Sequence, residues 1–188
     1  MSLKPLVIFS GRFQPYHFGH HVSILRVCDE LKATPVIIVV DGEKSKLDID
    51  RNPFGIDLRL KIVREAIFPH GGRVISHKDS YVPDLVRKVE ELLLREVKYV
   101  VAGQDRANEY KAQIKRDGIE GVEIVQFNKY FQISESSEER ISSTLLRAAL
   151  RNKDRKLFES MIPLAMFQFY KELVEAIETA DRTGRQSE

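Results

Sequence analysis

Short apolar runs rich in β-branched residues alternate along the chain with longer segments in which apolar positions recur at helical spacing. The short runs predict five strands, at Leu6–Ser10, Val36–Asp41, Arg73–Ser76, Tyr99–Ala102 and Val122–Phe127. The segments between them predict four helices, at Gly19–Lys32, Asp57–Phe68, Pro83–Glu96 and Arg106–Arg116. This alternation indicates a Rossmann-like, doubly wound α/β fold, in which helices cover a five-stranded parallel sheet.

The pattern changes after the fifth predicted strand. Asn128–Arg140 is rich in Ser and Glu and has no apolar period, so we expect a surface loop there. Three further helices are predicted, at Ser142–Leu150, Asp154–Met161 and Leu164–Thr179. We therefore expect one domain over residues 1–180, in which the helices of 142–180 cover the sheet and complete the site. The polar residues 181–188 are expected to form a flexible tail.

Composition narrows the class of protein. The 188 residues are 43% hydrophobic and 31% charged, with a formal net charge of +2, which suits one globular core and gives no general basic field for nucleic acid. The single cysteine, Cys28, excludes an intrachain disulfide and a cysteine metal cluster. No apolar run is long enough to cross a bilayer, and no cleavable signal is recognisable, so we expect a cytoplasmic protein with no membrane partner.

The first candidate site follows the first predicted strand, in the segment Gly11–His20. In open α/β sheets, ligands bind at the carboxyl ends of the strands. His17 and His20 are three residues apart at the start of a helix, so both rings can face one anion. Gly11 and Gly19 permit a close approach of backbone to ligand, and the helix N-terminus adds free N–H groups. No third ligand stands at zinc spacing nearby, so we expect a phosphate site and no protein-bound metal.

The second candidate site is Ile141–Arg147, where the polar loop gives way to a helix. Ser142 is suited to cap this helix, and the hydroxyl groups of Ser143 and Thr144 lie at its N-terminus. Arg147, one turn further on the same face, has a planar guanidinium that can donate twice to a phosphate.

These residues carry a resemblance to a known family. The segment GRFQPYHFGH at 11–20 is similar to the GRFQPxHxGH signature of the HxGH nucleotidylyltransferase superfamily, also called cytidylyltransferase-like, in its archaeal nicotinamide mononucleotide (NMN) adenylyltransferase form. The segment ISSTLLR at 141–147 resembles the superfamily's ISSTxxR motif. Asn52-Pro53-Phe54 with Arg59 is similar to its NPF…ER stretch, although Leu58 replaces the glutamate. Gly103-Gln104-Asp105 looks like the GxD turn that holds the nucleotide's ribose and base.

The resemblance implies an enzyme that transfers AMP from ATP to a phosphate-bearing small molecule and releases pyrophosphate, with NMN as the favoured acceptor. The expected catalytic residues are His17, His20 and Arg147. The expected nucleotide-binding residues are Gly11, Arg12, Phe13, Gly19, Gly103, Asp105, Ser142, Ser143 and Thr144. The expected acceptor-binding residues are Asp41, Lys46, Asn52, Arg59 and Arg106. A Mg²⁺ ion is expected to be held chiefly by the nucleotide and water, and we expect a homo-oligomer.

Other functions share these motifs. Cytidylyl transfer and pantetheine-phosphate adenylyl transfer use the same two phosphate motifs, which therefore do not choose among acceptors or between ATP and CTP. A nucleotide-binding domain without turnover is an alternative from another class. The presence of His17, His20 and Arg147 together argues against it.

Overall fold

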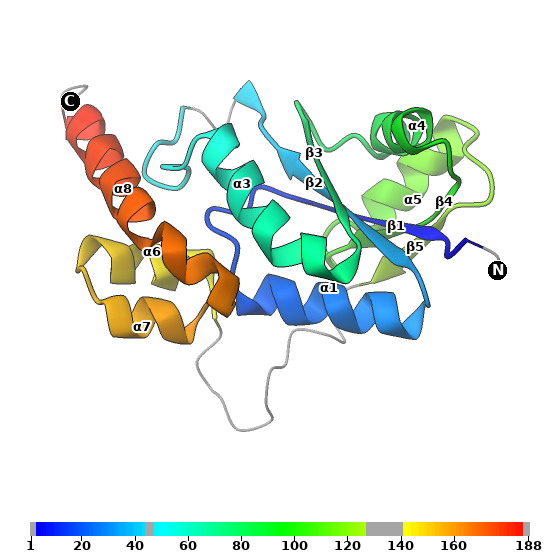
Figure 1. Cartoon of the computed structure of the whole chain (residues 1–188). Helices are drawn as coiled ribbons and strands as arrows, with labels where there is room; N and C mark the ends of the chain where they lie inside the picture. The colour runs from blue at the N-terminus through cyan, green and yellow to red at the C-terminus, as the bar shows by residue number, and fades with distance from the viewer. Residues whose placement is uncertain (1–2, 44–46, 127–140, 186–188) are drawn as a thin grey trace.

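A computed structural model describes residues 3–43, 47–126 and 141–185. Its centre is a five-stranded parallel sheet with the strand order β3-β2-β1-β4-β5 (Figure 1). The strands are β1 (Leu6–Gly11), β2 (Thr34–Val40), β3 (Arg73–His77), β4 (Val97–Ala102) and β5 (Glu123–Gln126). All five predicted strands are confirmed, and the predicted doubly wound α/β fold is correct.

Helices connect consecutive strands on both faces of the sheet (Figure 1). They are α1 (Phe18–Glu30), α3 (Ile56–Ile67), α4 (Val82–Leu93) and α5 (Ala107–Arg116), with a short 3₁₀ helix η1 (Phe68–His70) after α3. The strand order reverses between β1 and β4, because β2 and β3 were added on one side of β1, whereas β4 and β5 lie on the other side. The loops after β1, β2 and β4 therefore meet at the carboxyl edge, beside this switch point.

Alternate residues of each central strand point into two separate cores, as the period of two in a strand requires. Val7 and Phe9 of β1 belong to a core shared with α1, α3 and the C-terminal helices. Leu6 and Ile8 belong to a second core, shared with α4 and α5. Because both faces are buried, β1 and β2 are almost continuously apolar, which explains why the sequence pattern identified them.

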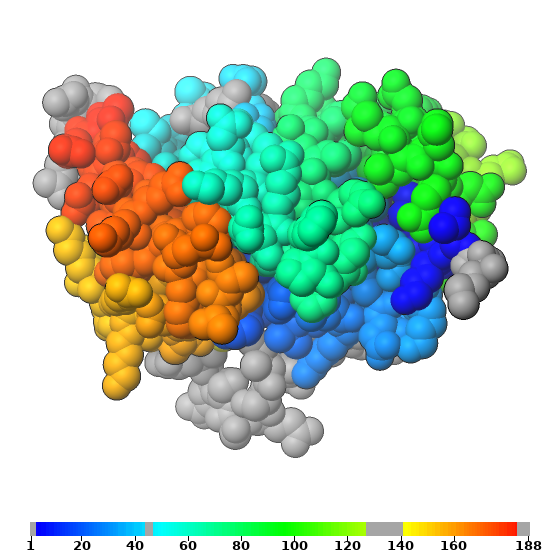
Figure 2. Space-filling view, in the orientation of Figure 1, coloured from blue at the N-terminus to red at the C-terminus, as the bar shows by residue number. Residues whose placement is uncertain are grey.

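The C-terminal helices form a block beside α1 and α3 (Figure 2). They are α6 (Ser143–Arg151), α7 (Arg155–Ser160), the 3₁₀ helix η3 (Leu164–Phe169) and α8 (Tyr170–Arg185). The predicted helix 164–179 is therefore wrong at both ends: its first six residues are a 3₁₀ turn, and α8 continues to Arg185. Asp181, expected in a flexible tail, forms an ion pair with Arg151 of α6, which explains the longer helix.

Some predicted segments lie outside the described residues. These are the loop Asn128–Arg140, the end of the fifth predicted strand at Phe127, and Lys46. Among the described helices, none combines the length and apolar character that a membrane span would need.

Candidate active site

Two stacked imidazole rings stand at the start of α1. The ring centroids of His17 and His20 are 3.8 Å apart, with an angle of 27° between the ring planes. His17 is the N-cap residue of α1 in an extended conformation, and His20 follows one turn later. The predicted pairing on one face is thus present. His21 points elsewhere, with its Nδ1 3.2 Å from the Tyr16 hydroxyl and its ring beside His70.

Gly19 makes room for the His17 ring. A Cβ atom added at Gly19 would lie 2.9 Å from Cε1 and 3.0 Å from Nδ1 of His17, closer than real Cβ contacts allow. The glycine between the two histidines is therefore needed for packing around His17 as well as for ligand access.

Aromatic side chains surround the second histidine. The His20 ring is 5.0 Å from Phe13, in an edge-on arrangement, and 5.5 Å from Tyr16, nearly parallel to it. Phe13 and Tyr16 are both buried. Tyr16 was not identified from the sequence, because an apolar or aromatic residue in a motif usually indicates core packing alone. In the structure it also fixes the orientation of His20.

Burial keeps both histidines neutral at physiological pH. It lowers the pKa of His17 from 6.5 to about 4. Burial also lowers the pKa of His20 well below its usual range, and the neighbouring His17 adds to the effect. The Nδ1 atoms of both rings are buried and make no hydrogen bond within the described part of the chain. Since buried polar atoms in proteins are normally paired, a ligand with acceptor oxygens would gain most at these rings.

The N-terminus of α1 is held by the C-terminal block. The backbone N–H of Phe18 donates to the Met161 carbonyl at 2.9 Å, and the N–H of His21 already donates to the His17 carbonyl. Met161 thus satisfies one of the N–H groups that a helix start leaves unpaired. Gly19 and His20 lie between Phe18 and His21, and their N–H groups have no acceptor within the helix. They form part of the positive end of the helix dipole, which attracts anions.

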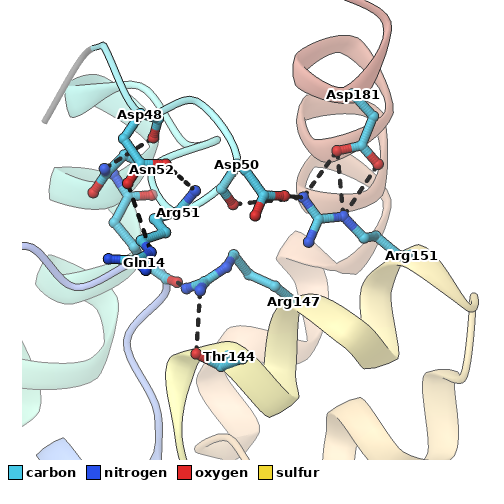
Figure 3. A network of polar contacts seen from close by, with 9 residues as sticks. All are labelled: Gln14, Asp48, Asp50, Arg51, Asn52, Thr144, Arg147, Arg151 and Asp181. Carbon is cyan, nitrogen blue, oxygen red and sulfur yellow. Dashed lines mark hydrogen bonds and ion pairs between the residues drawn. The ribbon is translucent and has the colours of Figure 1, made fainter. Parts of the chain in front are cut away.

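The second motif contacts the first through backbone carbonyls (Figure 3). Arg147 Nη1 donates to the Gln14 carbonyl at 2.8 Å, and Arg147 Nη2 donates to Thr144 Oγ1 at 3.2 Å. Ser143 Oγ donates to the Pro15 carbonyl at 3.0 Å. Ser142 caps α6 as predicted, since its hydroxyl accepts from the Leu145 N–H. Residues 128 or more positions apart are therefore brought to one site.

Arg147 and Arg12 form an electropositive corner. Burial lowers the pKa of Arg147, and the positive charges of Arg151 and Arg12 lower it further. Arg147 is nearly buried, but its guanidinium has more N–H donors than its two protein contacts use. Arg12 is exposed, and its Nη1 donates to Asn52 Oδ1 at 3.2 Å. An anion in this corner would relieve the repulsion between the guanidinium groups.

Gln14 is a functional residue that sequence reasoning did not select. Its side-chain amide is buried and makes two hydrogen bonds with the backbone of Phe54, both 3.1 Å long. Its Nε2 donates to the Phe54 carbonyl, and its Oε1 accepts from the Phe54 N–H. Gln14 therefore joins the first motif to the Asn52-Pro53-Phe54 segment, while its own carbonyl binds Arg147. In the sequence, its polar side chain between Phe13 and Pro15 was the feature that could have indicated this role.

Arg59, expected from the sequence to bind the acceptor, is held by four contacts within the chain. Its side chain is buried in α3, and it donates to the carbonyls of Phe54, Arg12 and Val40 at 2.9 to 3.0 Å. Its remaining contact is an ion pair with Asp41 at the end of β2. Desolvation of an arginine is costly unless partners surround it. Arg59 thus fixes the loops after β1 and β2, and it also lines the neighbouring cleft.

A cleft of about 910 Å³ opens next to these loops. Its walls are the segment from Ile49 to Arg59 and one side of α8, and Gln14 and Asp41 lie at its edge. Asn52, which accepts a hydrogen bond from Arg12, also lines this cleft. It therefore lies between the cleft and the corner formed by Arg12 and Arg147. Of the expected acceptor residues, Asp41, Asn52 and Arg59 thus lie around one cleft.

The turn after β4 stands beside the first motif in the sheet but is not bonded to it in the described structure. Gly103 begins the turn, and its carbonyl accepts from the N–H groups of Arg106 and Ala107. A Cβ atom at Gly103 would lie 2.6 Å from Asp105 Oδ1, so the carboxylate folds back over the glycine. Asp105 and Arg106 are exposed. A hydrogen bond to Tyr110 raises the pKa of Arg106.

Within residues 3–43, 47–126 and 141–185, no three His, Cys, Asp or Glu side chains are grouped so that they could hold a metal ion. The chemistry of the described donors is that of an anion site, composed of imidazole, guanidinium, hydroxyl and backbone N–H groups.

Comparison with known proteins agrees with this geometry. The family model described as cytidylyltransferase-like matches residues 8–149, which include both motifs. A nicotinamide-nucleotide adenylyltransferase of Pyrobaculum neutrophilum is 29% identical over 177 residues, covering 93% of this chain and 90% of the relative.

Two solved structures share the fold. One is a lipopolysaccharide core biosynthesis protein from Thermoplasma volcanium, with a TM-score of 0.51 and 21% identity, covering 66% of this chain and 96% of that chain. The other is TmcAL of Thermotoga maritima, with a TM-score of 0.61 and 11% identity, covering 92% of this chain and 56% of that chain. At these identities the likeness concerns the fold alone.

The pKa of His17 predicts how stability depends on pH. An unfolded chain titrates this residue near pH 6.5, and the folded chain near pH 4. Between these values the unfolded state binds more protons, so the free energy of unfolding should fall as pH drops from 7 to 5. The share of His17 is on the order of 1–2 kcal/mol. Urea denaturation should show a weaker pH dependence in His17→Asn than in the wild type or in the control His77→Asn. Equal pH dependence in all three would contradict the buried, neutral His17.

The burial of Arg59 predicts a stability defect. Arg59→Leu removes the ion pair with Asp41 and three hydrogen bonds to carbonyls, which should cost roughly 2–4 kcal/mol of unfolding free energy. Arg64→Leu, at an exposed position of the same helix, is the matched control and should cost little. If the two variants were equally stable in urea and only Arg59→Leu raised the KM for the acceptor, Arg59 would be an acceptor-binding residue without the structural role.

Proposed function

The chain belongs to the cytidylyltransferase-like family, and we propose that it is an adenylyltransferase that transfers AMP from ATP to NMN, giving NAD and pyrophosphate. The family assignment supports nucleotidylyl transfer, and the similarity to nicotinamide-nucleotide adenylyltransferases over nearly the whole chain supports this acceptor. The observation that carries the proposal is the stacked His17–His20 pair, because two neutral rings with unpaired buried nitrogens lie at a helix N-terminus.

The reaction requires no covalent intermediate with the protein. A phosphate oxygen of NMN attacks the α-phosphorus of ATP, and a new P–O bond forms. The bond from the α-phosphorus to the bridging oxygen breaks, and pyrophosphate leaves with that electron pair. Catalysis of such a step depends on positioning and on stabilising charge that develops on the transferring and leaving groups.

In this proposal His17 and His20 donate to the phosphate oxygens around the α-phosphorus. The N–H groups of Gly19 and His20 add donors from the helix start. Burial of the rings strengthens these interactions, because little water competes with them. Gly11 and Phe13 are proposed to line the site beside the histidines; they pack on each other, since a Cβ at Gly11 would lie 3.1 Å from the Phe13 ring.

Arg147 and Arg12 are proposed to hold the β and γ phosphates. Arg147 is oriented by Gln14 and Thr144, and Arg12 by Asn52. Ser142, Ser143 and Thr144 place the N-terminus of α6 at the same corner. Fixed donors of this kind lose little entropy when they bind a planar or tetrahedral oxyanion.

The base and the acceptor are proposed to lie on either side of the phosphates. Gly103 and Asp105, at the end of β4, would bind the ribose and adenine of ATP, with Asp105 accepting from ribose hydroxyls. Asp41, Asn52 and Arg106 would border the acceptor. Lys46 is proposed for the acceptor as well, but it lies outside the described residues.

A Mg²⁺ ion is proposed to enter with the nucleotide. Apart from the carboxylates of Asp41, which pairs with Arg59, and of Asp105, the described side chains at the site are cationic or neutral groups that suit phosphate. The ion would therefore keep phosphate oxygens and water as its ligands and would lower the charge on the leaving pyrophosphate.

The proposed function predicts NAD formation from NMN with ATP and far less product with CTP. A pocket that hydrogen-bonds adenine would leave polar groups unpaired when cytosine enters, and such mismatches are costly in a buried pocket. Pyrophosphate release should be measured with each triphosphate, crossed with NMN and with phosphopantetheine as acceptors. Turnover with CTP alone, or none with NMN, would instead favour a cytidylyl or pantetheine-phosphate transferase.

The stacked histidines predict a specific kinetic defect. His20→Ala should lower kcat on the order of a hundredfold to a thousandfold, because it removes a donor that acts mainly in the transition state. The KM for ATP should change much less. His21→Ala, the adjacent histidine that contacts Tyr16, is the control and should keep most of the wild-type kcat. An unchanged kcat with a raised KM in His20→Ala would assign His20 to ground-state binding.

A further inference from the structure

An ionic network joins the loop before α3 to two C-terminal helices (Figure 3). Arg151, the last residue of α6, donates from Nη2 to Asp50 Oδ1 at 2.6 Å. It also donates to the carboxylate of Asp181 on α8, from Nε at 3.1 Å and from Nη2 at 2.9 Å. The guanidinium side chain is only 30% exposed. One arginine thus bridges the loop and α8, in a paired geometry that lysine cannot reproduce.

The loop that Arg151 holds is internally bonded. Both the backbone N–H and the side-chain Nδ2 of Asn52 donate to the Asp48 carbonyl, at 2.9 and 3.0 Å. The backbone N–H of Arg51 donates to Asp48 Oδ1 at 3.1 Å. Because these bonds close a turn over residues 48–52, displacement of Asp50 would displace Asn52 as well.

The other end of this turn reaches the phosphate site. Asn52 Oδ1 accepts from Arg12 Nη1. Arg12 is exposed, and this bond restricts the positions that its guanidinium can take. Phe54 is fixed separately by Gln14. The chain is therefore anchored after the turn by Gln14, while Asp50, near the middle of the turn, is anchored by Arg151.

We propose that Arg151 is a positioning residue that acts on Arg12 through Asp50 and Asn52, and that it thereby sets the affinity for the triphosphate. This inference rests on the proposed function, in which Arg12 contacts a phosphate of ATP. Arg151 itself has its donors directed to two carboxylates and contacts no reacting group. Asp181 keeps the guanidinium in place, so α8 contributes to the phosphate site from a distance.

A purely structural alternative is that Arg151 only attaches α8 to α6. The chain offers a matched control for this alternative. Lys153, two residues after Arg151, forms an ion pair with Glu178 of α8 at 2.8 Å. That pair also ties the end of α6 to α8, but it does not contact the loop 48–52. Loss of attachment alone would therefore affect Lys153→Gln and Arg151→Gln alike.

Steady-state kinetics of pyrophosphate release should compare the wild type with Arg151→Gln, Asp50→Asn and Lys153→Gln. We expect the KM for ATP to rise roughly threefold to tenfold in the first two variants, with kcat changed less than about twofold, and no change in Lys153→Gln. In an Arg12→Ala background, Arg151→Gln should add little further effect, since Arg151 would act through the missing residue.

Amide hydrogen exchange gives a second measurement that does not depend on turnover. The N–H of Asn52 should exchange faster in Arg151→Gln and Asp50→Asn than in the wild type and Lys153→Gln. Equal exchange at Asn52, or a KM effect that is fully additive with Arg12→Ala, would overturn the inference. A wild type inactive with every triphosphate and acceptor would reject the proposed function instead, and the exchange result would then decide the inference alone.

Discussion

The contact on which the site depends is the hydrogen bond from Arg147 to the Gln14 carbonyl. The side-chain amide of Gln14 also pairs with the N–H and the carbonyl of Phe54. The next carbonyl along the chain, that of Pro15, accepts from Ser143. Three segments far apart in the sequence therefore meet at Gln14 and Pro15. Because the amide of Gln14 is buried, loss of any partner would leave an unpaired polar group there, which ties the two phosphate motifs to one geometry.

This geometry explains how two histidines can remain neutral side by side. Charged imidazoles at a centroid separation of 3.8 Å would repel each other, and burial disfavours the charged form further. The rings are held by Phe13, Tyr16 and the close approach to Gly19. The protein thus fixes neutral donors before a ligand arrives, and little reorganisation is needed when charge develops on the phosphate oxygens.

The sequence predicted what depends on local pattern. Strands buried on both faces are continuously apolar, and the motif residues lie close together in the chain, so the five strands, the His17–His20 pair and the Ser142 cap were all recognisable. The burial of Arg59 was not predicted, because resemblance to a motif says nothing of burial, and its partners are up to 47 residues away. The link from Arg151 to Asp50 spans 101 residues and has no local signal.

Most contacts that position the site end on backbone carbonyls. Arg147, Ser143 and the Phe18 N–H donate to the carbonyls of Gln14, Pro15 and Met161, and Arg59 donates to three more. A carbonyl is present whatever the side chain, so the residues that supply these acceptors can vary while the donors stay in place. This gives a physical reason why a chain only 29% identical to a relative can match it over almost its whole length. Side-chain pairs such as Arg151–Asp50 lack this tolerance, because both partners must be specified.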